Sequence, residues 1–167
     1  SPDLQYYRLS VLPSLLDKVH ANIKAGHSEF MLFEIGKGHT KARMGEDGLP
    51  AEQSLVDLVY SSKKPRVGAA FYRVRVALDQ LACDSGLTLV YTPVAAAQDD
   101  PVYAPFDINR SARIWVESSE TADQPERQLI GVVGELRPAV VKHFKLPDYT
   151  AAASLCLDVM EQVWRDT

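Results

Sequence analysis

The sequence predicts an α+β fold with a largely antiparallel β-sheet flanked by helices. Segments with helical spacing of apolar residues alternate with groups of short apolar runs, in the order helix, strands, helix, strands, helix. A doubly wound parallel sheet would instead show one strand and one helix in steady alternation. The apolar runs at 112–116 and 128–133 are separated by a polar stretch and most simply pair antiparallel. The 167 residues are predicted to form one domain, 1–167.

Four segments are predicted to be helices, because their apolar residues recur at helical spacing or because residues typical of helix ends flank them. Pro13 suits a first helical position, and Gly26 suits a helix end. Gly86 closes the second helix in the same way, and Asp158 is predicted to cap the last one, with Glu161 completing a capping box. The helices are predicted over residues 13–25, 71–82 and 138–144, and from residue 159 onward.

Short apolar or alternating runs bounded by turn residues predict the strands. Gly36 and Gly38 are predicted to end the first strand, and residues 46–48 are predicted to form a turn. The strands are predicted at residues 30–35, 55–60, 87–91, 112–117, 128–133 and 155–159.

The composition indicates a cytoplasmic globular protein. No run approaches the roughly 18 consecutive apolar residues of a membrane-spanning helix, so no membrane partner is predicted. The two cysteines, Cys83 and Cys156, form neither a CxxC motif nor a metal-ligand spacing. Both lie at apolar pattern positions and are predicted to be buried free thiols, which fits a reducing compartment.

The charge of the chain is unevenly distributed. The net charge is −4, but residues 37–75 carry a net +4 and the remainder a net −8. A local basic face could contact nucleic-acid phosphates, whereas a solvated charged surface is the simpler interpretation. The candidate tRNA-phosphate contacts are Lys37, Lys41, Arg43, Lys63, Lys64 and Arg66.

Residue chemistry alone predicts no catalytic, cofactor-binding or metal-binding residue. The Gly36–Thr40 stretch superficially resembles a phosphate-binding loop, but it lacks the first glycine of that motif and no helical pattern follows it. The four histidines show no zinc-ligand spacing, and no nucleophile-elbow motif is present.

A series of motifs, in order along nearly the whole chain, resembles the synthetase-like core of the bacterial phenylalanyl-tRNA synthetase β subunit. That family typically shows Arg-Thr-Ser-Leu-Leu-Pro-Gly-Leu-Leu, then Asn, then Leu-Phe-Glu-Ile-Gly, and later Ile-Gly-x-Ile-Gly-Glu-x-His-Pro. The corresponding stretches here are RLSVLPSLL (8–16), Asn22, LFEIG (32–36), NRSA (109–112), IGVVGELRP (130–138) and LCLD (155–158).

The resemblance implies a class II aminoacyl-tRNA synthetase-like core that is itself non-catalytic. Active cores of this class place an arginine on ATP phosphates just after the closing strand, and Val159 stands there in this sequence. No cofactor is implied for this chain, whereas ATP and Mg are implied for the parent ligase, a heterotetramer that attaches phenylalanine to tRNA. The chain would be a fragment of a longer β subunit.

The implied partners are the phenylalanyl-tRNA synthetase α subunit and, in the assembled enzyme, tRNA. The helix at 13–25 and its neighbouring strands are the expected contact elements for the α subunit. Two alternatives of other classes stay open at this point. One is a free-standing phosphate-handling enzyme that uses the Gly36–Thr40 loop, and the other is a standalone RNA-binding module that uses the basic stretch.

Overall fold

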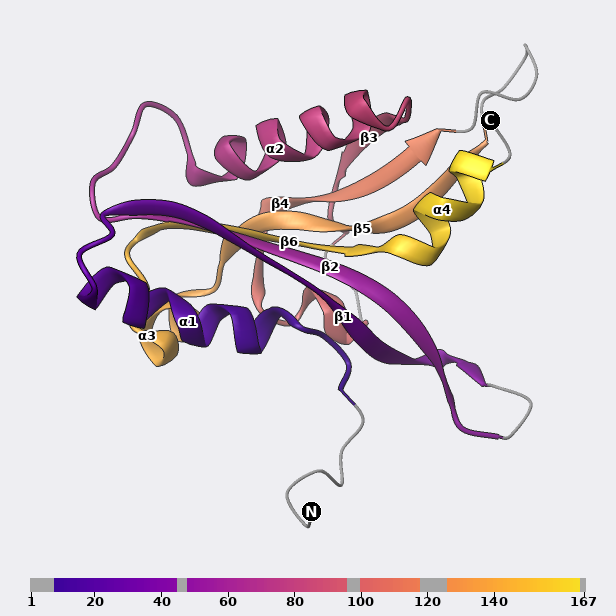
Figure 1. Cartoon of the computed structure of the whole chain (residues 1–167), viewed down its shortest axis with the longest axis horizontal. Helices are drawn as coiled ribbons and strands as arrows, with labels where there is room; N and C mark the ends of the chain where they lie inside the picture. Colours follow the sequence, from indigo (N-terminus) through magenta and orange to yellow (C-terminus); the bar gives the residue numbers. More distant parts are fainter. Residues whose placement is uncertain (1–7, 45–47, 96–99, 118–125, 166–167) are drawn as a thin grey trace.

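The computed structural model describes residues 8–44, 48–95, 100–117 and 126–165, without the side chains of 41–44 (Figure 1). The elements in chain order are α1 (Leu12–Lys24), β1 (Glu29–Met44), β2 (Pro50–Ser62), α2 (Ala70–Asp84), β3 (Thr88–Pro93), the 3-10 turn η2 (Pro101–Tyr103), β4 (Phe106–Glu117), β5 (Arg127–Leu136), α3 (Pro138–Phe144), β6 (Tyr149–Cys156) and α4 (Leu157–Arg165). Within the described residues, the six strands form one antiparallel sheet in the order β1-β2-β6-β5-β4-β3. The α+β prediction is therefore confirmed, including the antiparallel pairing of β4 with β5.

Helices cover both faces of the sheet and create two cores. α2 and α4 pack on one face, where Val74 and Leu78 of α2 contact a cluster that includes Ile114 and Ala153 (Figure 1). α1 and α3 lie on the opposite face, where the buried stripe of α1 packs against apolar residues of β2, β5 and β6. Because successive side chains of a strand point to opposite faces, the central strands supply residues to both cores.

The first helix follows its sequence pattern closely. It runs over Leu12–Lys24, and its buried residues recur at the spacing of one helical face: Leu12, Leu15, Leu16 and Val19. Pro13 occupies the first turn, where its missing N–H would have no partner within the helix. Gly26, at φ 99°, takes the left-handed conformation that lets the chain leave the helix.

The predicted end of the first strand was wrong. β1 continues through Gly36 and Gly38 to Met44, and Gly36 pairs with Leu55 of β2. The glycines provide room for neighbouring groups instead of ending the strand. A Cβ atom on Gly36 would lie 2.7 Å from Cγ1 of Val11, and one on Gly38 would lie 2.5 Å from Cδ1 of Leu55. Glu46 and Asp47 of the predicted turn lie outside the described residues.

The predicted closing strand and its helix cap were also wrong. β6 spans Tyr149–Cys156, and the chain is already helical at Leu157. The buried alanines at the centre of β6 have low strand propensity, which hid the start of the strand from sequence patterning. Asp158 lies inside the first turn of α4, and its carboxylate accepts the backbone N–H of Ser54 at 2.9 Å.

The cysteines are free, as predicted, but the prediction of burial was wrong. Cys83 is exposed at the end of α2, and Cys156 is half-buried at the end of β6. None of the helices formed by the described residues is long and apolar enough to cross a membrane.

Candidate functional site

The Gly36–Thr40 stretch is a regular β-strand segment. Thr40 pairs with Ala51 of β2, so the backbone N–H groups of the stretch point alternately toward β2 and away from it, and they do not converge on a common centre. A phosphate-binding loop requires several N–H groups that converge, usually at the beginning of a helix. The structure therefore does not favour the hypothesis of a phosphate-handling enzyme that uses this stretch.

The six predicted phosphate contacts are divided between the two ends of the β1–β2 hairpin. The N–H of Lys63 donates to the carbonyl of Ser28 at 2.8 Å, which fixes one group at the beginning of β1. Lys37 lies nine residues further along the strand, roughly 30 Å away at about 3.3 Å per residue. Lys37 and Lys63 therefore lie far apart along the hairpin. Lys37, Lys41 and Arg43 lie on β1, whereas Lys63, Lys64 and Arg66 follow β2.

Two of the six cations are already paired with carboxylates. Lys37 Nζ lies 3.1 Å from Glu52 Oε1, and the guanidinium of Arg66 forms an ion pair with Glu29. Lys63 and Lys64 are exposed in the segment after β2. The side chains of Lys41 and Arg43 lie outside the description. Contact between these residues and tRNA stays a prediction.

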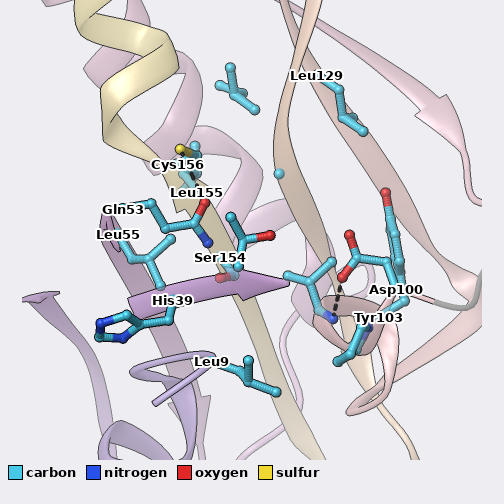
Figure 2. Close-up of a pocket in the computed structure, with 15 residues that line it drawn as sticks. Leu9, His39, Gln53, Leu55, Asp100, Tyr103, Leu129, Ser154, Leu155 and Cys156 are labelled. Carbon is cyan, nitrogen blue, oxygen red and sulfur yellow. Dashed lines mark hydrogen bonds between the residues drawn. The ribbon is translucent and has the colours of Figure 1, made fainter. Parts of the chain in front are cut away.

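A cavity of about 540 Å³ opens beside the hairpin, and sequence reasoning missed it (Figure 2). Figure 2 shows His39 and Gln53 from the hairpin on one side and Asp100 and Tyr103 from the η2 region on the other, with Ser154 of β6 between them. The remaining wall is mainly apolar. It consists of Leu9, Thr40, Leu55, Pro101, Val102, Leu129, Ile130, Gly131, Leu155 and Cys156.

The described lining of this cavity differs from a typical triphosphate site. Among the lining residues that the structure describes there is no lysine or arginine, and the single carboxylate comes from Asp100. The Oδ1 atom of Asp100 accepts the backbone N–H of Val102 at 3.0 Å and thereby begins the η2 turn. Phosphate recognition normally relies on guanidinium or ammonium groups with charge-assisted hydrogen bonds. In the part of the chain that the structure describes, no cluster of three His, Cys, Asp or Glu residues could hold a metal ion.

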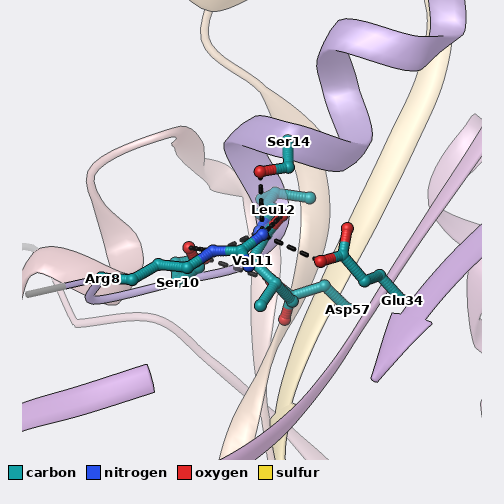
Figure 3. A network of polar contacts seen from close by, with 7 residues as sticks. All are labelled: Arg8, Ser10, Val11, Leu12, Ser14, Glu34 and Asp57. Carbon is teal, nitrogen blue, oxygen red and sulfur yellow. Dashed lines mark hydrogen bonds and ion pairs between the residues drawn. The ribbon is translucent and has the colours of Figure 1, made fainter. Parts of the chain in front are cut away.

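A polar network near the cavity anchors the beginning of α1 (Figure 3). The Nη2 atom of Arg8, which carries two N–H groups, donates to Glu34 Oε1 at 2.9 Å and to Ser14 Oγ at 2.8 Å. Ser10 Oγ accepts the backbone N–H of Leu12 at 3.1 Å, which satisfies one of the free donors of the first helical turn. Arg8 and Ser10 therefore hold the helix terminus against β1 and β2.

Asp57 lies at the buried end of this network. Its side chain is fully buried, and its Oδ2 atom accepts the hydroxyl of Ser10 at 3.1 Å. Burial raises the pKa of the Asp57 carboxyl, while hydrogen bonds from Ser154, Ser10 and the backbone of Leu12 and Val11 oppose the rise. Asp57 is not among the residues that line the cavity, so it supports the helix terminus and does not face a ligand.

Comparison with protein families gives one match across most of the chain. Residues 1–157 match the family described as the phenylalanyl tRNA synthetase beta chain CLM domain. The chain belongs to this family. The similarity of the CLM domain to two phenylalanine–tRNA ligase beta subunits agrees, with 30% identity over 161 residues for the protein from Carboxydothermus hydrogenoformans and 26% over 182 residues for that from Thermobifida fusca. Each match covers 92% of this chain but only 18% and 20% of the relative, so the chain spans about a fifth of their length.

Solved structures show the same fold at low sequence identity. Two structures of pyrrolysyl tRNA synthetase from Desulfitobacterium hafniense match 96% of the CLM domain and 50% of their own chains, with TM-scores of 0.62 and 0.63. The identities are 13% and 12%, so this likeness concerns the fold alone.

The structure locates Val159 of this CLM domain. Val159 lies in the first turn of α4 and is half-buried against the core beneath α2, whereas the cavity opens beside the β1–β2 hairpin. Since β6 ends at Cys156, the first residue after the closing strand is Leu157. Val159 therefore packs against the core in the first turn after the closing strand, and its correspondence to the arginine position of active cores stays a prediction.

The cavity of the CLM domain left little signal in the sequence. Its walls come from β1, β2, β5, β6 and the η2 region, several of which are distant along the chain. The pairing of Gly131 with Leu155 could be anticipated only from the strand order, because both segments look like ordinary buried strands. The aspartate before Pro101 was the one local cue, since aspartate followed by proline favours a turn.

Proposed function

We propose that this domain is a non-catalytic, class II synthetase-like core of the phenylalanyl-tRNA synthetase β subunit. It supports docking of the α subunit and placement of tRNA during the ATP-dependent attachment of phenylalanine. The observation that carries the proposal is the absence of lysine and arginine among the described residues that line the cavity, in a domain that shares its fold with a tRNA synthetase.

The described lining of the cavity supplies no fixed positive side chain that would stabilise phosphate charge. Activation of an amino acid concentrates negative charge on the phosphates of ATP, and enzymes stabilise that charge with fixed positive groups. The cavity offers only neutral side chains, His39 and the carboxylate of Asp100, which repels phosphate. This lining supports the proposal that ATP and Mg are bound elsewhere in the parent enzyme.

Pyrophosphate exchange tests the non-catalytic assignment. The isolated chain is incubated with ATP, labelled pyrophosphate and phenylalanine, with the assembled α–β enzyme as the positive control. We expect no phenylalanine-dependent exchange above background from the chain alone. Exchange that depends on phenylalanine and is lost in the variant Ser154→Trp, which fills the cavity, would show that the domain is catalytic.

The exposed face of α1 is the proposed contact with the α subunit. The helix turns its apolar stripe into the core, so the outward face presents Pro13, Ser14, Asp17 and Lys18. A polar face of this kind suits a contact that is formed and oriented by charge.

Co-purification with a tagged α subunit tests this contact. We expect the chain to be retained by the α subunit, and we expect Lys18→Glu to weaken retention. Asp84→Lys, at the exposed end of α2 on the opposite face of the sheet, is the matched control and should bind as the wild type does. No retention of the wild-type chain would contradict the docking role, and equal weakening by both variants would contradict the choice of surface.

A further inference from the structure

The first strand leaves part of its outer edge without a neighbouring strand. β1 is the last strand on its side of the sheet among the described residues (Figure 1). The N–H of His39 points away from β2, because it donates to the carbonyl of Arg8 at 2.8 Å. Backbone groups on one side of a strand recur every second residue, so those of Met31, Phe33 and Ile35 also point outward. Among the residues that the structure describes, no strand pairs with this edge before the position that Arg8 occupies.

The residues with outward backbone groups also carry an exposed apolar stripe. The exposed fractions are 37% for Met31, 68% for Phe33 and 64% for Ile35. The three side chains lie on the face that α2 and α4 cover further along the sheet, because Met31 pairs with Tyr60 of the core beneath α2. An apolar stripe along an open sheet edge is a template for pairing with another strand.

One charged residue lies at each end of this stripe, on the same face of β1. Glu29 precedes Met31 and pairs with Arg66, while Lys37 follows Ile35 and pairs with Glu52 at 3.1 Å. Every second residue of this edge therefore follows a symmetric pattern around Phe33: an acidic residue at one end, three apolar residues, and a basic residue at the other end.

We propose that this edge pairs with the same edge of a second copy of the chain. In an antiparallel arrangement centred on Phe33, each Phe33 lies opposite its counterpart, and Met31 lies opposite Ile35 of the second copy. The same register places Glu29 opposite Lys37 of the second copy, so both ends of the pairing gain an opposite-charge contact. Because the residues opposite one another all have outward N–H and C=O groups, each such pair exchanges two backbone hydrogen bonds.

The extent of the open edge fits a second copy of β1. The carbonyl of Arg8 occupies the edge at His39, and the β1 strand of the second copy would begin at Glu29, opposite Lys37. The paired strand of the second copy therefore stops just before His39 of the first copy, where Arg8 of the first copy already occupies the edge. A two-fold axis through Phe33 makes this contact self-complementary. Each copy uses its β1 edge once, so the contact forms a dimer and does not extend into a filament.

The dimer is weak, because three exposed side chains and one strand bury much less than the roughly 1,200–2,000 Å² of a stable interface. It forms only at high protein concentration, and it is measured by sedimentation velocity across a wide concentration range. Phe33→Lys places two ammonium groups opposite each other at the centre and should abolish dimerisation. Val76→Lys is the matched control, since Val76 on α2 is 67% exposed and lies outside the pairing. A wild-type chain that stays monomeric throughout, or a Phe33→Lys chain that still dimerises, would overturn the proposal.

A charge exchange tests the register. Lys37→Glu alone would place two carboxylates opposite each other at both ends of the pairing, and Glu29→Lys alone would place two ammonium groups there. Each variant by itself should dimerise at least about tenfold more weakly than the wild type. An equal mixture of the two should regain dimerisation, because both end contacts then join opposite charges. Thermal melts establish that each variant is folded before mixing, and a mixture that associates no better than its components would rule out this register.

Discussion

Val11 packs its Cγ1 methyl group against the backbone of Gly36, at the place where a Cβ atom would lie 2.7 Å away. Val11 is fully buried and directly precedes α1, whereas Gly36 lies in β1. This contact allows the beginning of the helix to lie directly on the strand. It explains why a glycine occurs inside a long regular strand, where glycine is normally unfavourable.

Gly36→Ala should lower the free energy of unfolding by about 1–3 kcal/mol, because the new methyl group overpacks the contact with Val11. Urea unfolding monitored by circular dichroism measures the change. The double variant Val11→Ala/Gly36→Ala removes the methyl group that clashes, so it should be less destabilised than the sum of the two single variants. Additive effects would mean that the two residues do not constrain each other.

Leu16→Ala should lower the free energy of unfolding by about 2–5 kcal/mol, because it leaves a cavity in the core beneath α1. Leu16 is 1% exposed and belongs to the cluster that includes Val59 and Phe106. Val76→Ala, at an exposed position of α2, should change stability by no more than about 0.5 kcal/mol. An unchanged urea midpoint for Leu16→Ala would show that this stripe of α1 does not contribute to the core.

Asp57→Asn should change how stability depends on pH. Burial raises the pKa of Asp57 in the folded protein, so the folded state retains this proton at pH values where the unfolded chain has released it. The contribution of the proton to stability is complete below the unfolded pKa of about 3.9 and is lost as the pH rises through the folded pKa. The wild type should therefore lose stability relative to Asp57→Asn as the pH rises from this value. Urea unfolding at a series of pH values tests this, and parallel profiles for the two proteins would contradict it.

The isolated domain should bind tRNA weakly at low salt and lose this binding near physiological ionic strength. The basic residues form two separated groups, so few phosphates are contacted at once, and the acidic remainder of the chain repels RNA. Filter binding across a salt series measures both the affinity and its salt dependence.

Replacing both Lys63 and Lys64 with Glu should weaken tRNA binding by the assembled enzyme without altering its assembly. Both lysines are exposed, and they lie together after β2. Glu52→Gln is the control. It removes the carboxylate that pairs with Lys37, so it changes the charge at the group of cations on β1 and leaves Lys63 and Lys64 unchanged. An unchanged affinity and salt slope in the double variant would show that the two lysines only contact solvent.

The sequence by itself determined the local elements and their class. The spacing of Leu12, Leu15, Leu16 and Val19 predicted α1 and its buried face, because a helix repeats every 3.6 residues whatever lies beside it. The alternation around Ile114 predicted β4, because side chains of a strand point alternately to the two faces of a sheet. The apolar run at 128–133 predicted its antiparallel partner, β5. The ordered motifs from residue 8 to residue 158 indicated the family, and the match over residues 1–157 confirmed it.

Only the tertiary structure decided what the glycines and charges do. Gly36 resembles a strand breaker until Val11 is seen to occupy the space beside it, and Asp158 resembles a helix cap until Ser54 is seen to donate to it. The cavity and the separation of Lys37 from Lys63 also depend on strand order and register. These features arise from contacts between segments far apart in the sequence. A periodic pattern specifies which face of an element is buried, but it does not specify which residue lies opposite.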